Sequence, residues 1–358
     1  MDLKNYLSGT YDSNDFSFEP TLFDIDDPNS RDNLILFIDK NKNRINVFST
    51  IENQLKELIK INSPKQKFSE KELKKELNSW RKERGINFYG TWVYYPWNQR
   101  LVHLLPKTDF IRLRTSRNQY KITPMEQLEL ESKKVGVIGL SVGQSVALTM
   151  AMERVAGTLR LADFDHLDLS NLNRIRSPLS NLGLPKTIMV AREIAEIDPF
   201  LKVELFPEGI TDHNLEQFLG DGADKLDLLV EECDALDVKI KARLAARSKG
   251  IPVVMDTSDR GMLDIERFDL EPERPIMHGM VSDDQAKNME QWTPKERLAL
   301  VMDMVGAEDI SSRLKASLLE VEETLTTWPQ LASSVVLGGA LATVAVRAIL
   351  LSKKCSSG

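Results

Sequence analysis

Residues 134–174 read KVGVIGLSVGQSVALTMAMERVAGTLRLADFDHLDLSNLNR, and this stretch decides the fold. The aliphatic run at 135–138 predicts a strand, which Gly139 ends, and the amphipathic run after it predicts a helix. A second apolar run ends at Asp163. This order is typical of a nucleotide-binding unit, because phosphate approaches the N–H groups at the helix start and the acid accepts hydrogen bonds from ribose hydroxyls.

The glycine pattern of this unit is incomplete. Glycines are usual at 139, 141 and 144, whereas this chain has Gly139, Ser141 and Gln144, with Gly143 displaced by one position. Ser141 adds a Cβ and a hydroxyl where phosphate nears the backbone, and Gln144 adds bulk where we expect helix and strand to pack. The glycines alone are a weak signal. Asp163 strengthens it, because an acid about 20 residues beyond the glycines indicates ribose recognition.

Strand and helix patterns alternate from residue 134 onward. The strands are predicted at 135–138, 158–163, 201–206, 226–231 and 251–256, and the helices near 144–155, 186–197, 213–220 and 236–249. The alternation predicts an α/β fold with a Rossmann-like, mostly parallel sheet and helices on both faces. Ligands of such sheets bind beyond the carboxyl ends of the strands. The residues that follow predicted strands include Gly139, Asp163, Asp165, Asp234 and the run 256–260.

Residues 1–110 are predicted to form a separate α+β region. Capping-box spacings at Ser49 with Glu52 and at Ser69 with Glu72 precede amphipathic patterns and predict two helices. The aromatic and β-branched residues between 90 and 105 predict one or two strands with a turn near Pro96. His103 lies in this apolar run without a carboxylate or nucleophile beside it, so we expect a core histidine and not a catalytic one.

Residues 291–358 are predicted to be helical. Thr293, Pro294 and Glu296 form a helix start, Gly306 is its expected end, and 312–325 continues as a helix. The apolar run 331–351 is rich in Ala and Gly and contains Arg347, so we interpret it as a helix packed on the core or at a homodimer interface. A membrane span is the alternative that we reject.

Composition excludes several classes of protein. The 358 residues include 42% hydrophobic ones and carry a net charge of −7, which fits a globular protein of two domains and argues against a nucleic-acid-coating surface. Only Cys233 and Cys355 are present, so one chain builds neither a disulfide framework nor a four-cysteine zinc site. The first twenty residues lack a basic start and an apolar core, so we expect no export signal and a cytoplasmic location.

The segment Asp163–Arg174 carries a specific resemblance. Its sequence, DFDHLDLSNLNR, resembles the D-x-D and S-N-L-N-R motifs of the ThiF/MoeB/HesA family, the bacterial relatives of ubiquitin-activating enzymes. Gly183, Pro185 and Lys186 resemble the G-x-P-K segment of that family. Cys233-Asp234 resembles the end of the strand motif D-C-T-D-N of the family. Arg114, Arg117 and Asn118 resemble its R-Y-x-R-Q segment. The resemblance covers about residues 112–269.

The resemblance implies an activity and a set of site residues. Members of the family let a carboxylate attack the α-phosphate of MgATP, which gives an acyl-adenylate and pyrophosphate. The domain that carries this activity would span 111–290. By resemblance, Asp163 would bind the ribose and Asp234 would hold Mg²⁺. The phosphates would be contacted by Asn171, Arg174, Lys186 and, from a partner subunit, Arg117. The ATP site would be completed by Gly139, Ser141, Gly143, Asp165 and Asn173.

Each implied role has a structural alternative. Asn171 could be a turn residue, Lys186 a residue of a first helical turn, and Asp234 the N-cap of the next helix. Asp259 and Arg260 lie where we expect the acceptor side of the site and are candidate substrate contacts, although a plain polar turn is the preferred interpretation of this segment. For His278, packing is the preferred interpretation over catalysis.

Departures from the family pattern limit the expected chemistry. Ala235 replaces the Asn that follows the metal-binding Asp, and Glu231 replaces the first Asp of the strand motif. No CxxC pair is present, so no zinc site is expected. No thioester-forming cysteine is evident, because Cys233 ends a predicted buried strand and Cys355 lies in a terminal segment.

The sequence is consistent with two functions. The first is ATP-dependent adenylation of a carboxylate, either the C-terminus of a ubiquitin-like carrier protein or a small acid. The alternative is a non-catalytic nucleotide-binding scaffold or sensor of the same fold. The proteins that this chain resembles often continue into a nitroreductase-like flavin domain, so such a domain or partner is also expected.

Overall fold

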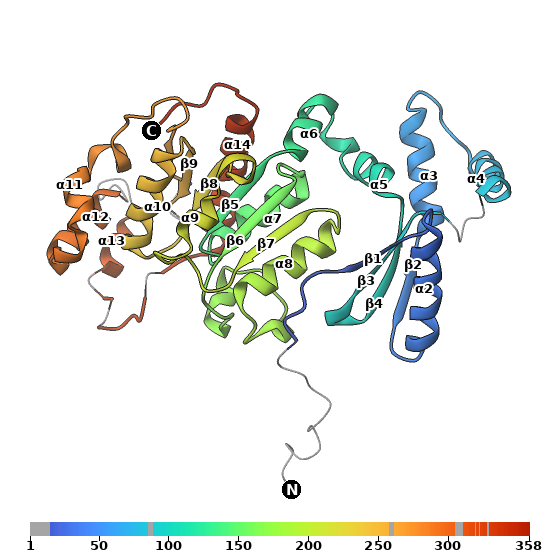
Figure 1. Cartoon of the computed structure of the whole chain (residues 1–358), viewed down its shortest axis with the longest axis horizontal. Helices are drawn as coiled ribbons and strands as arrows, with labels where there is room; N and C mark the ends of the chain where they lie inside the picture. The colour runs from blue at the N-terminus through green and yellow to red at the C-terminus, as the bar shows by residue number, and fades with distance from the viewer. Residues whose placement is uncertain are drawn as a thin grey trace, which may run out of the picture. The chain divides into compact units, whose positions relative to one another are not determined.

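The strands predicted between residues 135 and 256 form one sheet in the computed structural model (Figure 1). The structure describes residues 15–84, 89–257, 261–304, 311–318, 320, 321, 323–327 and 329–358. The chain divides into two units, Met1–Lys121 and Ile122–Gly358, and each is considered by itself.

The first unit contains a four-stranded sheet of order β1-β3-β4-β2. Its strands are β1 (Thr21–Asp24), β2 (Asn46–Ser49), β3 (Thr91–Tyr95) and β4 (Arg100–Leu104), and its helices are α2 (Pro28–Asn41), α3 (Ile51–Asn62), α4 (Glu70–Arg84) and α5 (Lys107–Arg114). β3 and β4 form an antiparallel hairpin around a 3₁₀ turn at Pro96–Asn98, which confirms the strand prediction for this part of the chain. β2 pairs with β4 in parallel.

Two of the local predictions for the first unit have opposite outcomes. Ser69 and Glu72 cap α4 reciprocally, as predicted, because the N–H of Ser69 donates to the Glu72 carboxylate at 2.7 Å and the N–H of Glu72 donates to the Ser69 hydroxyl at 3.3 Å. The predicted cap by Ser49 is wrong. Ser49 ends β2, its hydroxyl lies 3.1 Å from Nδ1 of His103, and Thr50 precedes the helix instead.

His103 is a core residue, as predicted. Its side chain is buried, its Nε2 lies 2.7 Å from the carbonyl oxygen of Tyr89, and its ring stacks on Trp92. Burial lowers the pKa of His103, so the neutral ring is favoured.

The second unit contains a six-stranded sheet of order β10-β9-β8-β5-β6-β7. Its strands are β5 (Lys134–Ile138), β6 (Thr158–Ala162), β7 (Lys202–Phe206), β8 (Leu228–Glu231), β9 (Val253–Asp256) and β10 (Leu263–Glu266). Five strands are parallel, and β10 pairs with β9 in the antiparallel direction. β8 and β9 are buried on both faces, as their unbroken apolar runs predict.

Helices cover both faces of this sheet (Figure 1). One hydrophobic cluster joins the sheet to α7 (Gly143–Glu153), α8 (Lys186–Ile197) and α14 (Ala332–Leu350). Another joins it to α9 (Leu215–Leu219) and α10 (Leu236–Ser248). The remaining helices are α6 (Pro124–Glu131), α11 (Asp283–Lys287), α12 (Pro294–Met304) and α13 (Ser312–Leu318). The fold class is therefore the Rossmann-like α/β class that the sequence predicts.

The strand order places a crevice between β5 and β8. The chain leaves β5 toward β6 on one side, and after β7 it returns to form β8 on the other side. The connections that follow β5 and β8 therefore diverge, and this divergence opens a ligand crevice at the carboxyl edge of the sheet.

The C-terminal helices differ in part from their predicted bounds. α12 has the predicted cap, because Thr293 and Glu296 hydrogen-bond to each other, whereas its expected end at Gly306 lies outside the described residues. The helix predicted over 312–325 is wrong in length, since α13 ends at Leu318.

α14 packs on α7 and lies against β9. A Cβ at Gly338 would lie 1.7 Å from a carboxylate oxygen of Asp256, so the close contact requires glycine. By length and composition α14 could cross a membrane, but half of its apolar window is buried inside the protein, as in core helices. Val336 and Val344 remain exposed on its outer face.

A buried charge cluster fixes α10 to the sheet. Arg243 is fully buried and donates to Glu231 on β8 and to Glu266 on β10, both at 2.6 Å. Burial alone would raise the pKa of Glu231, but Lys239 and Arg243 lower it to about 2. His278 lies at the edge of this cluster, 2.7 Å from Asp264, which raises its pKa.

Replacement of Arg243 by Met is expected to lower the free energy of unfolding by about 3–5 kcal/mol, because the buried carboxylate of Glu266 loses its cation and that of Glu231 keeps only Lys239. Lys241 is the matched control: it lies on the same helix and pairs with Asp212 at the surface, so Lys241→Ala should cost less than about 1 kcal/mol. Denaturant unfolding of both variants measures the difference, and equal losses would contradict the assignment.

Candidate nucleotide site

A cleft of about 190 Å³ lies in the predicted crevice. Its walls come from the turn after β5, the segment after β6, a loop after β7 and the segment from β8 into α10. The lining residues are Ile138, Gly139, Ser141, Ala162, Asp163, Phe164, Asp165, Gly209, Ile210, Glu232, Cys233, Asp234, Ala235 and Val238. Five of the predicted site residues therefore line one cleft, namely Gly139, Ser141, Asp163, Asp165 and Asp234.

Close contacts explain the two glycines of the turn. Gly139 has a φ of +84°, and a Cβ there would lie 2.7 Å from the backbone nitrogen of Cys233. A Cβ at Gly143 would lie 2.7 Å from the Val137 side chain, so Gly143 allows α7 to pack on β5. The bulk expected from Gln144 where helix and strand pack is not placed there, because its side-chain amide hydrogen-bonds to the backbone of Arg176.

Asp163 ties the ends of β5 and β6 together. One of its carboxylate oxygens accepts from the N–H of Leu140 at 2.6 Å, and the other accepts from the N–H of Asp165 at 2.8 Å. Burial raises the pKa of Asp163, and the Lys186 charge opposes this shift. The carboxylate thus lies beside the glycine turn, as expected for a ribose-binding acid.

Lys186 brings three predicted residues together. It begins α8, its side chain is only 3% exposed, and its Nζ lies 2.8 Å from Asp165 and 3.0 Å from the hydroxyl of Ser141. A lysine needed only for a first helical turn would extend into water. The buried ammonium instead lies beside the glycine turn, where phosphate would bind.

The S-N-L-N-R motif forms a 3₁₀ segment, Leu169–Asn173. The Asn171 side chain accepts from the N–H of Asp168 at 3.1 Å, so Asn171 has the turn role that was its alternative. The amide of Asn173 donates to the carbonyl of Gln330 at 2.7 Å, immediately before α14. The motif is therefore held partly by hydrogen bonds within the protein.

Arg174 retains an unused donor. Its guanidinium donates to the Asn173 side chain at 3.0 Å, but its Nε is buried without a hydrogen-bond partner among the residues that the structure describes. Burial lowers the pKa of Arg174, and the nearby charge of Asp234 opposes this shift. A buried donor without a partner in the protein indicates a place for a ligand oxygen.

Asp234 is an exposed side chain in the cleft wall. Its alternative role as an N-cap is wrong, because Ala235 occupies the cap position of α10 without a side-chain hydrogen bond. Among the described residues no group of three His, Cys, Asp or Glu side chains could hold a metal ion. A single carboxylate still fits Mg²⁺, which commonly takes its other ligands from water and substrate phosphates.

Cys233 lines the cleft but has a poor environment for a nucleophile. Burial and the Glu231 charge raise the pKa of its thiol, which disfavours the thiolate. The segment with Cys355 extends along β10, where Gly358 and Ile265 exchange backbone hydrogen bonds at 3.1 Å. The environment of Cys233 therefore disfavours a role as a thioester-forming nucleophile.

The geometry of this cleft does not test three of the candidate residues. Arg117 is exposed on a 3₁₀ turn, Ser116–Asn118, in the first unit, so its predicted phosphate contact stays a prediction. Asp259 and Arg260 lie outside the described residues.

Glu232 is a cleft residue that the sequence patterns did not indicate. Its side chain is 7% exposed, lines the cleft and accepts from the N–H of Asp256 at 3.0 Å. Burial and the neighbouring Asp256 carboxylate raise the pKa of Glu232 well above its ordinary value. The position of Glu232 just after β8 could have indicated a site residue. Two consecutive glutamates, however, are typical of an exposed surface.

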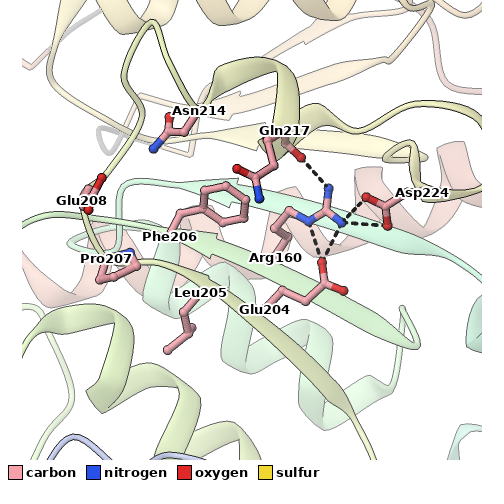
Figure 2. A pocket seen from close by; sticks show the side chains of 9 residues that line it. All are labelled: Arg160, Glu204, Leu205, Phe206, Pro207, Glu208, Asn214, Gln217 and Asp224. Carbon is pink, nitrogen blue, oxygen red and sulfur yellow. Dashed lines mark hydrogen bonds and ion pairs between the residues drawn. The ribbon is translucent and has the colours of Figure 1, made fainter.

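A second hollow, with none of the residues that line this cleft, lies beside β6 and β7 (Figure 2). It has a volume of about 430 Å³, and the buried Arg160 lies in its wall. The Arg160 guanidinium donates to Glu204 at 2.6 Å, to Asp224 at 3.0 Å and to the carbonyl of Phe218 at 2.7 Å. Because these contacts use the guanidinium within the protein, we assign Arg160 a structural role.

Comparison with known proteins agrees with this geometry. The model of the ThiF family matches residues 115–348. The Uncharacterized protein MT1398 of Mycobacterium tuberculosis is 44% identical over 267 residues, which are 75% of this chain and 37% of that protein. The Adenylyltransferase and sulfurtransferase UBA4 of Lodderomyces elongisporus is 32% identical over 109 residues, which are 30% of this chain and 23% of that protein.

A solved structure, TcdA (CsdL), has the same fold. It superposes with a TM-score of 0.50 at 18% identity and covers 70% of this chain and 98% of its own. The chain spans 37% of the length of its mycobacterial relative. Since the family model matches 234 of 358 residues, the chain belongs to the ThiF family.

Proposed function

We propose that this protein activates a carboxylate by ATP-dependent adenylation, which gives an acyl-adenylate and pyrophosphate. The observation that carries the proposal is the buried Lys186 ammonium, which contacts Ser141 of the glycine turn and Asp165 of the family motif. Membership of the ThiF family and the similarity to an adenylyltransferase support the same reaction.

The reaction needs charge neutralisation more than acid–base catalysis. An oxygen of the carboxylate forms a bond to the α-phosphorus, the bond from that phosphorus to the bridging oxygen breaks, and pyrophosphate leaves with the electron pair. The nucleophile is already ionised at neutral pH. Lys186 and Arg174 would stabilise the charge that develops on the phosphate oxygens, and their positions limit the loss of entropy.

The remaining site residues have proposed binding roles. Asp163 would accept from the ribose hydroxyls, and Gly139, Ser141 and Gly143 would let the phosphates approach the N-terminus of α7. Asp234 would hold Mg²⁺, which neutralises phosphate charge when bound.

The partner and substrate are also proposed. Arg117 would reach the phosphates from the second subunit of a homodimer, and Asp259 and Arg260 would contact the acceptor side. The acid would be the C-terminus of a ubiquitin-like carrier protein or a small acid. A nitroreductase-like flavin domain or partner would use the activated product.

Pyrophosphate exchange tests the function. With MgATP and panels of carrier C-termini and small acids, the protein should move label from pyrophosphate into ATP once the right acid is present. ATP binding without exchange across both panels would contradict adenylation and support the scaffold or sensor function, for which Arg174→Ala would leave the biological role unchanged.

Lys186→Ala is expected to lower the exchange rate at least about a hundredfold, because the transition state loses a cation. Lys225→Ala is the control: Lys225 is exposed and donates to the Lys249 carbonyl, away from the lining of the cleft, so exchange should stay unchanged. A folded Lys186→Ala protein that keeps its activity would contradict the proposed role.

Asp234→Asn is expected to raise the Mg²⁺ concentration for half-maximal exchange about tenfold or more, since a charged ligand is lost. Asp212→Asn removes an exposed carboxylate that pairs with Lys241, outside the lining of the cleft, and should leave this concentration unchanged. Identical Mg²⁺ dependence of the two variants would exclude Asp234 as a metal ligand.

A further inference from the structure

Gln144 forms a paired contact with the backbone of one residue. Its side chain is only 3% exposed, although a surface amide would normally point into water. Its Nε2 donates to the carbonyl of Arg176 at 2.9 Å, and its Oε1 accepts from the N–H of Arg176 at 3.1 Å. An amide that uses both its donor and its acceptor on one backbone residue fixes the position and the direction of that residue.

A third contact extends this arrangement to α8. Nε2 of Gln144 also donates to Glu193 at 3.1 Å, and the guanidinium of Arg176 lies 3.4 Å from the same carboxylate. Burial raises the pKa of Glu193, and Arg176 opposes this shift. Gln144 therefore connects α7, α8 and the segment that follows the 3₁₀ motif.

The fixed backbone lies two residues beyond Arg174. Ile175, between them, is 2% exposed and packs in the hydrophobic core. The Arg174 side chain donates one hydrogen bond to the neighbouring Asn173 and has a buried Nε without a partner among the described residues. The direction of its guanidinium consequently depends on how the backbone of residues 173–176 is held.

We propose that Gln144 is a positioning residue that keeps the Arg174 guanidinium directed toward the nucleotide cleft. The inference rests on the proposed function for the phosphate that Arg174 would bind. A glycine at 144 would leave the N–H and carbonyl of Arg176 without this partner. The glutamine that replaces the usual glycine therefore supports the site and does not weaken it.

A double-mutant cycle on the full chain tests the inference. MgATP affinity is measured by equilibrium titration for the wild type, Gln144→Met, Arg174→Ala and the double variant. Gln144→Met should weaken MgATP about tenfold when Arg174 is present and less than about twofold when Arg174 is already Ala, because coupled residues give non-additive effects. Equal losses in both backgrounds, or no loss in either, would overturn the inference.

Two control variants separate positioning from folding. Gln127 is also buried and donates to a backbone carbonyl, that of Arg154, at 2.7 Å, so Gln127→Met removes a similar hydrogen bond away from the cleft and should show no coupling to Arg174. Glu193→Gln keeps both bonds to the Arg176 backbone and should leave MgATP affinity within about twofold. An effect of Glu193→Gln as large as that of Gln144→Met would also overturn the inference.

A second variant covers the case in which Gln144→Met does not fold. Gln144→Glu combined with Glu193→Gln exchanges amide and carboxylate and keeps the bond between the two side chains and the acceptor for the Arg176 N–H. It loses the donor to the Arg176 carbonyl and the ion pair of residue 193 with the Arg176 guanidinium. It should weaken MgATP about threefold, again only when Arg174 is present. The two proposals are contradicted by different results. A protein that binds MgATP but shows no pyrophosphate exchange contradicts adenylation. Full exchange without coupling between residues 144 and 174 contradicts only the role of Gln144.

Discussion

The cleft depends on the two hydrogen bonds that Asp163 accepts. The bond from Leu140 holds the glycine turn against the end of β6, and the bond from Asp165 sets the direction of the chain after that strand. Asp165 then lies beside Lys186, and Lys186 lies beside Ser141 of the same turn. One buried carboxylate thus links the turn, the motif and the start of α8. Its burial is costly, and the nearby ammonium offsets part of that cost.

The fold of the second unit could be predicted because its signal is periodic. Apolar runs that alternate with helical patterns identify parallel strands, and the predicted strand positions agree with β5 to β9 within a few residues. In the first unit β1, α2 and β2 were not predicted. The residues of β2 are all exposed, so they lack the apolar alternation on which such predictions depend.

The candidate site was predictable where a residue type has one chemical use and not where neighbours decide its role. Lys186 and Asp163 lie beside the glycine turn, and their binding roles stay predictions. Gln144 was expected to disturb helix packing, because a sequence does not show that its side chain points to Arg176, 32 residues away. Ser49 matched a capping spacing, yet His103, 54 residues away, is its actual partner. Contacts between distant residues were thus the main source of error.

The contact between Asn173 and Gln330 joins residues 157 positions apart. Because the acceptor is a backbone carbonyl, this contact depends on the path of the chain and not on the side chain at 330. A substitution at position 330 would therefore leave this acceptor in place, whereas a change in the length of the chain just before α14 would move it away from the motif. The segment that precedes the C-terminal helix therefore helps to hold the motif, although it lies far from the motif in sequence.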